Sequence, residues 1–384
     1  MYNISKATHH QLSRFLYPKL YPDFRKLIED ALKGGQIGKT ELINTTKTEP
    51  AIEVRLKVRK GSLTYWFLDD LLQGDNLRLL LIGEIEYLLE MKKRIDAALR
   101  KHPDAIKEEV NQKITKQHVY DKLNKGVPYA MQPDPVKVDV DHFCSILYEL
   151  FVEKGYEKLL DKKDLVRQKE LRICPYCGRS YIYSVDVNNN CVKPDIDHFF
   201  PKSKYPYMAL SYYNLIPACN TCNKLHCKDN HEAYDYKNKR FRFPYPYCFK
   251  DSDIKFSYKL TDMSYLRDDA FEVKVKYAYN GMTESCRDYL HLDALYAEHR
   301  HEAANIYRTL MLLTSKAAWY YRKFNIPPRL LTPTPNLIFG FGFGRNVARL
   351  ELLYKFKHDI YCQIMNSVVA KRYKQMMILL KKAK

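Results

Sequence analysis

Two Cys-x-x-Cys pairs constrain the fold of this chain more than any other feature. The first pair is Cys174 and Cys177, and the second is Cys219 and Cys222. Four thiolates arranged in two such pairs supply the ligands of one tetrahedral zinc ion. We therefore expect these four cysteines to converge on a structural zinc site.

The segment between the two pairs predicts a hairpin followed by a helix. Its 41 residues, at positions 178–218, exceed the roughly 15–20 of a plain zinc ribbon. Residues 179–187 and 191–198 have the character of two strands, and the three asparagines at 188–190 suit the turn between them. The second cysteine pair then opens a short helix from about Thr221 toward Asp229.

The bulk properties indicate a folded protein with a polyanionic partner. A chain of 384 residues with 46% hydrophobic residues can form two or three packed domains. Lys and Arg exceed Asp and Glu by 64 to 45, which leaves a formal charge of +19. A charge of this size favours nucleic acid as the partner.

The cysteines and the apolar segments predict a cytoplasmic protein that does not enter the membrane. The first 30 residues lack the uninterrupted apolar core of a signal peptide, so the ten cysteines are expected in a reducing cytoplasm. The longest apolar stretches are interrupted by charge, as where residues 79–82 precede Glu84 and Glu86. Cys191 and Cys227 lie close enough to the pairs in sequence to remain alternative metal ligands.

The pattern of apolar residues predicts an α+β protein with three regions. Residues 1–165 are mainly helical, with helical periodicity at 24–32, 68–99 and 140–160 and one strand at 52–58. Residues 166–245 hold the cysteine pairs and form a compact core. Residues 246–384 begin with a hairpin of 254–260 and 271–277 and continue as helices at 299–323 and 347–380.

Asp197 and His198, between the cysteine pairs, suggest phosphodiester chemistry. Hydrolysis of a phosphodiester needs an activated water, a cation on the phosphate and stabilisation of the leaving oxygen. His198 is the candidate base, and Asp197 offers a hard oxygen ligand for Mg²⁺ or Mn²⁺. Asn223 follows the last cysteine, where a second oxygen ligand is needed. Asp195, on the same strand face, either assists the metal or serves a turn or salt bridge.

These residues together resemble the HNH endonucleases, which are ββα-metal nucleases with a zinc-knuckle frame. The family order is C-x-x-C, D-H with Pro and Ser soon after, N-L, and C-x-x-C-N with a Lys or His a few residues on. About 55 of the 384 residues carry this resemblance. The matching positions are Cys174, Cys177, Asp197, His198, Pro201, Ser203, Asn214, Leu215, Cys219, Cys222, Asn223 and His226.

The resemblance implies a role for each matching polar residue. His198 would be the general base, with Asp197 and Asn223 as ligands of the catalytic metal. Asn214 would clamp the loop that orients the histidine. His226 remains an alternative to Asn223 as metal ligand, or a phosphate contact.

The basic residues around this block are candidate contacts to a nucleic-acid backbone, with double-stranded DNA as the expected substrate. They lie after the base, on the helix and beyond it: Lys202, Lys204, Lys224, Lys237, Lys239 and Arg240.

The segments around Asp197 and Asn214 are also similar to HNH nucleases of prokaryotic antiviral systems, including the PtuB-like nucleases of Septu and retron-linked modules. These nucleases act beside an ATPase, and this chain contains no G-x-x-x-x-G-K-[ST] motif. The resemblance therefore implies a separate ATPase or sensor partner, and the helical flanks offer a surface for a homodimer. A stand-alone restriction or homing nuclease and a non-catalytic zinc-stabilised nucleic-acid-binding protein are the alternatives.

Overall fold

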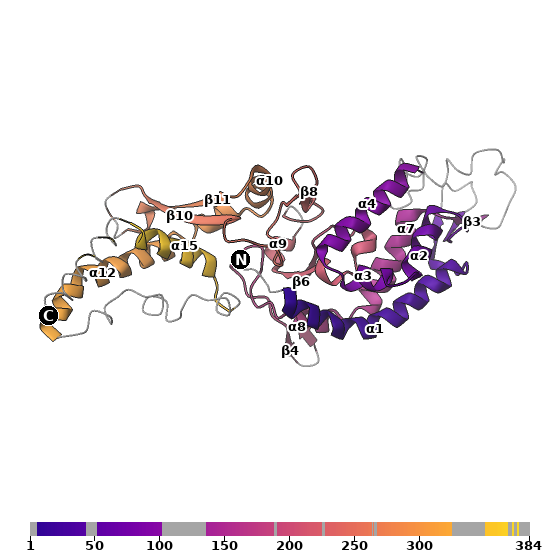
Figure 1. Ribbon diagram of the computed structural model, residues 1–384, viewed down its shortest axis with the longest axis horizontal. Helices are drawn as coiled ribbons and strands as arrows, with labels where there is room; N and C mark the ends of the chain where they lie inside the picture. The colour runs from indigo at the N-terminus through magenta and orange to yellow at the C-terminus, as the bar shows by residue number, and fades with distance from the viewer. Residues whose placement is uncertain are drawn as a thin grey trace.

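The chain folds as an elongated α+β protein, seen in a computed structural model (Figure 1). Helices dominate one end, small sheets and helices form the other, and the cysteine pairs lie between them. The parts of the chain that the structure describes are residues 6–43, 52–101, 136–187, 190–224, 227–262, 264, 267–324, 350–367, 371 and 375.

The N-terminal end combines helices with a three-stranded sheet. The helices are α1 (Lys6–Leu32), α2 (Leu63–Leu72), α3 (Asn76–Ile82), α4 (Ile85–Lys101), α7 (Phe143–Leu147), the π-type helix η1 (Tyr148–Leu159) and α8 (Lys162–Lys169). The strands are β1 (Ile37–Ile43), β2 (Ile52–Leu56) and β3 (Val136–Val140). β2 pairs antiparallel with β1 and parallel with β3. The alternation of residues 52–58 predicted β2, whereas β1 and β3 were not predicted.

The central part is built from short elements. It contains β4 (Val185–Val187), β5 (Asn190–Val192), β6 (Asp195–His198), the 3₁₀ turns η2 (Pro206–Met208) and η3 (Tyr212–Asn214), β7 (Leu215–Ala218), α9 (Asn220–Asn223), β8 (Tyr234–Asp235) and β9 (Arg240–Phe241). Three separate antiparallel pairs form here, β4 with β5, β6 with β7, and β8 with β9.

The predicted hairpin and helix are wrong in their extent and in their pairing. The strand assigned to residues 179–187 is limited to Val185–Val187, and the segment expected to return from the turn divides into β5 and β6. β6 pairs with β7 instead of β4, because its partner comes from beyond a long loop. The helix after the second cysteine pair ends at Asn223 and does not continue toward Asp229.

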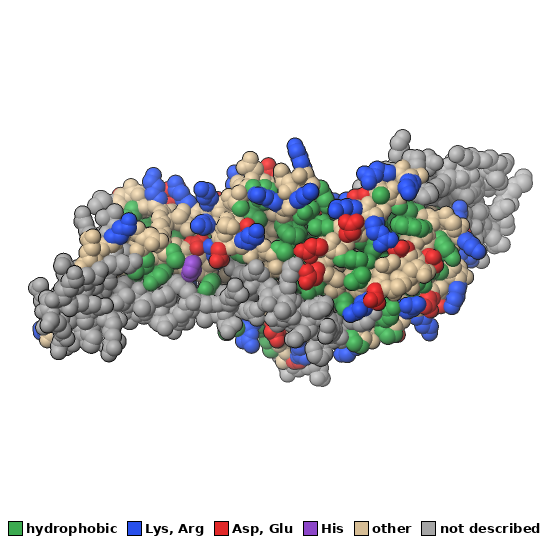
Figure 2. All heavy atoms as spheres, in the orientation of Figure 1, with side chains coloured by type: hydrophobic (Ala, Val, Ile, Leu, Met, Phe, Trp, Pro, Cys, Tyr) green, Lys and Arg blue, Asp and Glu red, His purple; other side chains and the backbone are tan. Residues whose placement is uncertain are grey.

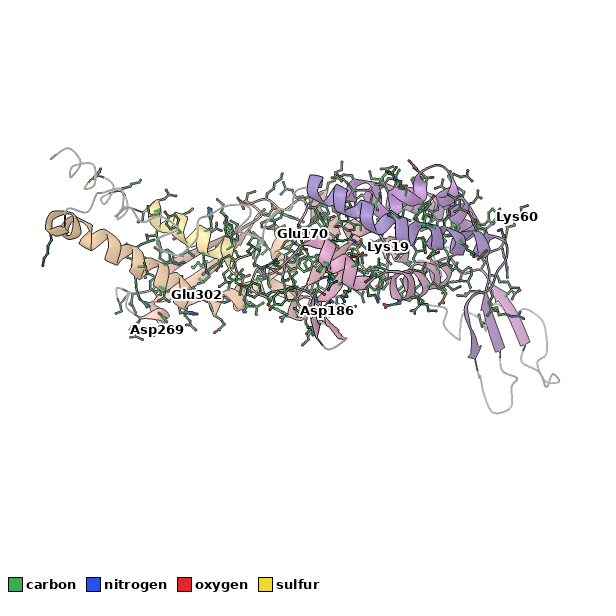
Figure 3. All side chains as sticks on the ribbon, turned by 90° about the horizontal axis from the view of Figure 1, so that it is seen from below. Lys19, Lys60, Glu170, Asp186, Asp269 and Glu302 are labelled. Atoms are coloured by element: carbon green, nitrogen blue, oxygen red, sulfur yellow. The ribbon has the colours of Figure 1, made fainter. Side chains whose placement is uncertain are left out.

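The C-terminal end contains the predicted hairpin, β10 (Ile254–Leu260) with β11 (Phe271–Tyr277), in continuous antiparallel register. The remaining elements are η4 (Asp268–Ala270), α10 (Asn280–Glu284), η5 (Ser285–Tyr289), α11 (Leu292–Ala297), α12 (Arg300–Phe324) and α15 (Tyr354–Met365). α15 packs along the edge of β10, where Asp359 Oδ2 accepts from the Phe256 amide at 3.0 Å. In Figure 3, Asp269 and Glu302 of this part lie far from Lys60, which follows β2 at the opposite end.

One continuous hydrophobic core joins these parts. Phe67 of α2 contacts Phe151 of η1 and Tyr207 of the loop after β6, with ring centroids 6.5 Å and 5.9 Å apart. Gly155 lets η1 approach the same loop closely, because a Cβ there would lie 2.5 Å from Leu210 Cδ1. The next two residues of η1, Tyr156 and Glu157, are thereby brought to the central part.

Basic and acidic side chains are interspersed on the face of the molecule drawn in Figure 2. Lys and Arg are distributed along its length instead of gathering over one element. Within the described residues, every helix falls short of the length and apolar character needed to cross a bilayer.

Candidate metal centre and adjoining polar pocket

The four cysteines of the two pairs come together in one buried cluster. The first pair lies in a tight turn, where the Gly178 amide donates to the Cys174 carbonyl at 2.8 Å and Gly178 has a φ of 67°. The second pair frames the start of α9, with the Cys222 amide donating to the Cys219 carbonyl at 3.0 Å. All four Sγ atoms lie within 4.8 Å of one another. The predicted convergence is confirmed.

The dimensions of the cluster suit a metal ion such as zinc. Zinc–sulfur bonds of about 2.3 Å place tetrahedral ligand atoms about 3.8 Å apart, and Cys177 Sγ lies 3.9 Å from Cys219 Sγ. Hydrogen bonds with Cys174 lower the pKa of Cys219 and Cys177, whereas burial raises the pKa of Cys174 and a hydrogen bond with Cys174 raises that of Cys222. A bound metal would need all four as thiolates. Among the described residues, no other group of three or more His, Cys, Asp or Glu side chains converges in this way.

Groups outside the four ligands hold the first cysteine pair in place. The Arg179 amide donates to Cys177 Sγ at 3.4 Å, and the Tyr296 hydroxyl donates to the Cys177 carbonyl at 2.6 Å. The Leu353 amide donates to the Gly178 carbonyl at 2.8 Å. Because Tyr296 and Leu353 belong to the C-terminal part, that part is attached directly to the cysteine turn.

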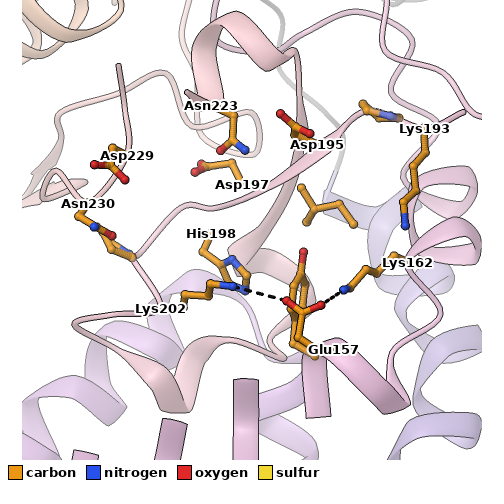
Figure 4. A pocket seen from close by; sticks show the side chains of 14 residues that line it. Glu157, Lys162, Lys193, Asp195, Asp197, His198, Lys202, Asn223, Asp229 and Asn230 are labelled. Carbon is orange, nitrogen blue, oxygen red and sulfur yellow. Dashed lines mark hydrogen bonds and ion pairs between the residues drawn. The ribbon is translucent and has the colours of Figure 1, made fainter. Parts of the chain in front are cut away.

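A polar pocket of about 420 Å³ opens beside β6 and α9. Its lining includes four of the polar residues singled out as candidates for catalysis or metal binding: Asp195, Asp197, His198 and Asn223 (Figure 4). The strand pair positions them, because Asp195 lies opposite Ala218 while His198 lies opposite Leu215. α9 follows β7 after a single residue, so its last residue, Asn223, reaches the same pocket as Asp197.

His198 is held as a neutral imidazole with one free nitrogen. Its Nε2 lies 3.2 Å from the Ala209 carbonyl, and since a carbonyl only accepts, Nε2 carries the proton. Nδ1 then keeps its lone pair. Burial, followed by the positive charge of Lys202, lowers the pKa of His198 to about 3. The edge-to-face contact with Tyr156, at 4.5 Å between ring centroids, fixes the orientation of the imidazole.

Asp197 is fixed by a buried lysine and a buried tyrosine. Lys228 Nζ lies 2.9 Å from Asp197 Oδ2 and 3.2 Å from Oδ1, and the Tyr176 hydroxyl also donates to Oδ2. The side chain of Lys228 has no exposed surface, and that of Asp197 is 4% exposed. A carboxylate offers about four acceptor positions, so Oδ1, which accepts only from Lys228 in these contacts, retains capacity for a further ligand.

Lys228 also joins the strand to its loop, since its Nζ donates to the carbonyls of His198 and Phe199 at 3.1 Å and 3.0 Å. The sequence analysis missed this residue. Nothing in the local sequence distinguishes Lys228 from the exposed Lys224 four residues earlier. Lys228 is buried because it pairs with Asp197, which lies 31 positions away in the sequence.

Asn214 clamps the loop between β6 and β7 from inside the protein. Its Oδ1 accepts from the Phe200 amide at 2.7 Å, and its Nδ2 donates to the carbonyls of Phe200 and Met208 at 3.2 Å and 3.0 Å. Asn214 is fully buried and does not line the pocket. It therefore acts at the loop and makes no approach to a substrate.

The two candidates for the helix-side metal ligand have different outcomes. Asn223 is half-buried and lines the pocket, whereas His226 lies outside the described residues. Asp195 also lines the pocket, and its Oδ2 accepts from Asn220 Nδ2 at 3.1 Å. Cys227 is described and is not part of the four-sulfur cluster, and the side chain of Cys191 is outside the description.

The predicted backbone contacts separate into two groups. Lys202 lines the pocket, whereas Lys204 and Lys224 lie outside its lining. Lys237, Lys239 and Arg240 are exposed on the β8–β9 hairpin, also away from the pocket. Contacts of these six residues with a nucleic-acid backbone remain a prediction.

The N-terminal part supplies a wall of the pocket that the sequence analysis did not predict. Tyr156 and Glu157 come from η1, and Lys162 comes from the first turn of α8. The side chain of Asp161 caps that turn by accepting from the amides of Lys163 and Asp164, both at 3.0 Å. A helix cap at Asp161 could be read from the sequence, but its position beside His198 could not.

Comparisons of the chain with protein-family models, with curated proteins and with solved structures give no match. The chemistry of the pocket is therefore inferred from its own residues.

Proposed function

We propose that this protein is a metal-dependent endonuclease of the HNH type that hydrolyses phosphodiester bonds of DNA. One observation carries the proposal: His198, with a free Nδ1, lines the same pocket as the oxygen ligands Asp197 and Asn223. The strand pair and short helix that carry these residues are framed by a four-cysteine cluster suited to zinc.

The geometry suits general-base hydrolysis, because Nδ1 of His198 is unprotonated at neutral pH. The negative charge of a bound phosphate would raise the low pKa of the imidazole toward the range in which it acts as a base. His198 Nδ1 accepts a proton from a water molecule, the water oxygen forms a bond to phosphorus, and the bond to the leaving sugar oxygen breaks. A divalent cation held by Asp197 and Asn223, with Asp195 beside them, would neutralise charge on the phosphate and the leaving oxygen. Tyr156 and the Ala209 carbonyl keep the imidazole aligned, because the ring of Tyr156 packs against it and the carbonyl binds Nε2 and leaves Nδ1 available.

The biological setting that we propose is prokaryotic antiviral defence, with an ATPase or sensor protein as partner and the helical flanks as a surface for dimerisation. This part of the proposal is supported by the resemblance of the segments around Asp197 and Asn214 to nucleases of such systems. A stand-alone restriction or homing nuclease would share the same pocket chemistry but would cut without a partner.

A non-catalytic nucleic-acid-binding protein is the second candidate. The ion pair of Asp197 with Lys228 favours it, because a carboxylate already neutralised by a buried ammonium serves folding without any metal.

Plasmid digestion by the zinc-loaded full chain with added Mg²⁺ or Mn²⁺ tests the proposal. The wild type should cleave, and His198→Ala should lower the cleavage rate by about 10²- to 10⁴-fold, the usual contribution of a general base. His301→Ala is the matched control, since the side chain of His301 is 53% exposed and lies outside the pocket. Equal cleavage by wild type and His198→Ala would refute the base, and salt-dependent binding without any cleavage would establish the binding protein.

A further inference from the structure

Glu157 lies at the pocket with its carboxylate between two lysines from different elements. Lys162 Nζ pairs with Glu157 Oε2, and Lys202 Nζ lies 3.6 Å from Oε1 (Figure 4). Lys162 begins α8, and Lys202 is in the loop after β6. Two ammonium groups thus converge on one carboxylate in the polar pocket.

This three-residue group is close to the proposed base through a shared aromatic ring. The ring of Tyr156 lies 4.4 Å from Lys162 Nζ and 5.2 Å from Lys202 Nζ, measured to its centroid. The same ring contacts the imidazole of His198 at 4.5 Å between centroids. Any group that replaced the Glu157 carboxylate would therefore lie next to the base.

The electrostatics indicate an anion site. Burial alone would raise the pKa of Glu157, but the hydrogen bond from Lys162 and the charges of Lys162 and Lys202 outweigh it, and the pKa is lowered overall. The carboxylate is thus held as an anion. A phosphodiester carries the same single negative charge and offers equivalent acceptor oxygens to two lysines.

Stability alone does not account for this placement. The side chains of Lys162, Glu157 and Lys202 are 21%, 41% and 34% exposed, and ion pairs of that exposure contribute little to folding. Their partial exposure does allow a ligand to reach the lysines. The carboxylate can be exchanged for another anion without opening the hydrophobic core.

We propose that Lys162 and Lys202 form a subsite for a phosphate of the substrate strand, next to the one that is cut. Glu157 occupies this subsite in the free protein and releases both lysines when the strand enters. The inference rests on the proposed function for the identity of the strand. It adds Lys162, from the N-terminal part, to the substrate contacts and makes Glu157 an internal competitor of the substrate.

Binding of a short DNA duplex, measured by fluorescence anisotropy at several salt concentrations without added Mg²⁺ or Mn²⁺, tests the subsite independently of cleavage. Glu157→Gln should bind roughly 3- to 10-fold more tightly than wild type, because the competing charge is removed. Its dependence on salt should be steeper by about one unit on a double-logarithmic plot. Glu153→Gln is the matched control, since it removes the same charge from η1 outside the pocket.

The lysines provide the second arm of the experiment. Lys162→Met or Lys202→Met, combined with Glu157→Gln, should abolish the gain in affinity, whereas Lys158→Met, an exposed residue outside the pocket, should preserve it. If Glu157→Gln binds no more tightly than Glu153→Gln, or if the gain survives loss of both lysines, the subsite is refuted. A gain in binding by a protein that never cleaves DNA would support the subsite and refute the nuclease.

Discussion

The four-cysteine cluster and the polar pocket flank the same strand pair, yet they are assembled differently. The cluster takes all its sulfur atoms from two four-residue segments, a turn and the start of α9, and it is buried. The pocket takes Tyr156 and Glu157 from η1, Lys162 from α8, His198 from β6 and Asn223 from α9, and it is open to solvent. The cluster is therefore formed by local sequence, whereas the pocket depends on how distant parts of the chain pack.

Disrupting the four-cysteine cluster should have the largest effect on stability. Cys222→Ser removes one of the four sulfur ligands, and structural zinc contributes about 10–16 kcal/mol of apparent binding energy in small zinc domains. We expect loss of zinc, measured by metal analysis of the purified protein, together with loss of the cooperative thermal transition.

Cys286→Ser is the matched control for Cys222→Ser. Cys286 is buried in the C-terminal part and is not in the cluster, so this variant should keep its zinc and lose about 1–3 kcal/mol for burying a hydroxyl. Retention of one zinc ion per chain by Cys222→Ser would contradict the assignment of the four cysteines as a zinc site.

Breaking the buried ion pair behind the pocket should have the next largest effect. Lys228→Met leaves the carboxylate of Asp197 buried without its ammonium partner, which should cost about 3–5 kcal/mol in the free energy of unfolding. Urea denaturation measures the change.

Two further variants test whether the loss of stability comes from the unpaired charge of Asp197. Lys224→Met, at an exposed position, should stay within about 0.5 kcal/mol of wild type. Adding Asp197→Asn to Lys228→Met should restore part of the loss, because the unpaired charge is removed. Equal unfolding energies for the two lysine variants would show that the ion pair does not stabilise the fold.

The pH dependence of stability should show the smallest effect of the three. The pKa of His198 is about 3 in the folded protein and about 6.5 in an unfolded chain. Below pH 6.5 the unfolded chain binds a proton that the folded protein excludes, so stability is complete above pH 6.5 and falls toward pH 3. The contribution of His198 should reach about 1.4 kcal/mol per pH unit.

Denaturation at pH 7, 5.5 and 4.5 measures this contribution as a difference between two proteins. His198→Gln keeps a neutral polar side chain and should lose less stability than wild type over this range. If the free energy of unfolding declines equally in both proteins, groups other than His198 cause the loss of stability in acid.

The elements predicted correctly are those whose pattern is local. Alternating apolar and charged residues at 52–58 and in the two segments 254–260 and 271–277 correspond to β2 and to the β10–β11 hairpin. Such alternation indicates which face of a strand is buried, and it can be recognised within the strand's own residues.

The elements missed or misplaced depend on distant partners. β3 pairs with β2 across some 80 residues, and β6 pairs with β7 across a loop that Asn214 holds shut. The sequence of β6, Asp195 to His198, shows no apolar alternation, so its pairing cannot be derived from its own residues. Lys228 was not predicted for the same reason, since Asp197 lies 31 positions away from it. Glu157 was not predicted because Lys202, the second of its two lysine partners, comes from a different element.

By itself, the sequence determined which four sulfur atoms converge, because the spacing within each Cys-x-x-Cys pair fixes their local geometry. It also singled out Asp197, His198 and Asn223, which the fold places in one pocket. Only the tertiary structure decided what surrounds them: a buried ammonium behind Asp197, and Glu157 between two lysines beside the imidazole. The packing of η1 and α8 sets the positions of Glu157 and Lys162, and the segment after α9 brings Lys228 to Asp197. No local pattern encodes that packing.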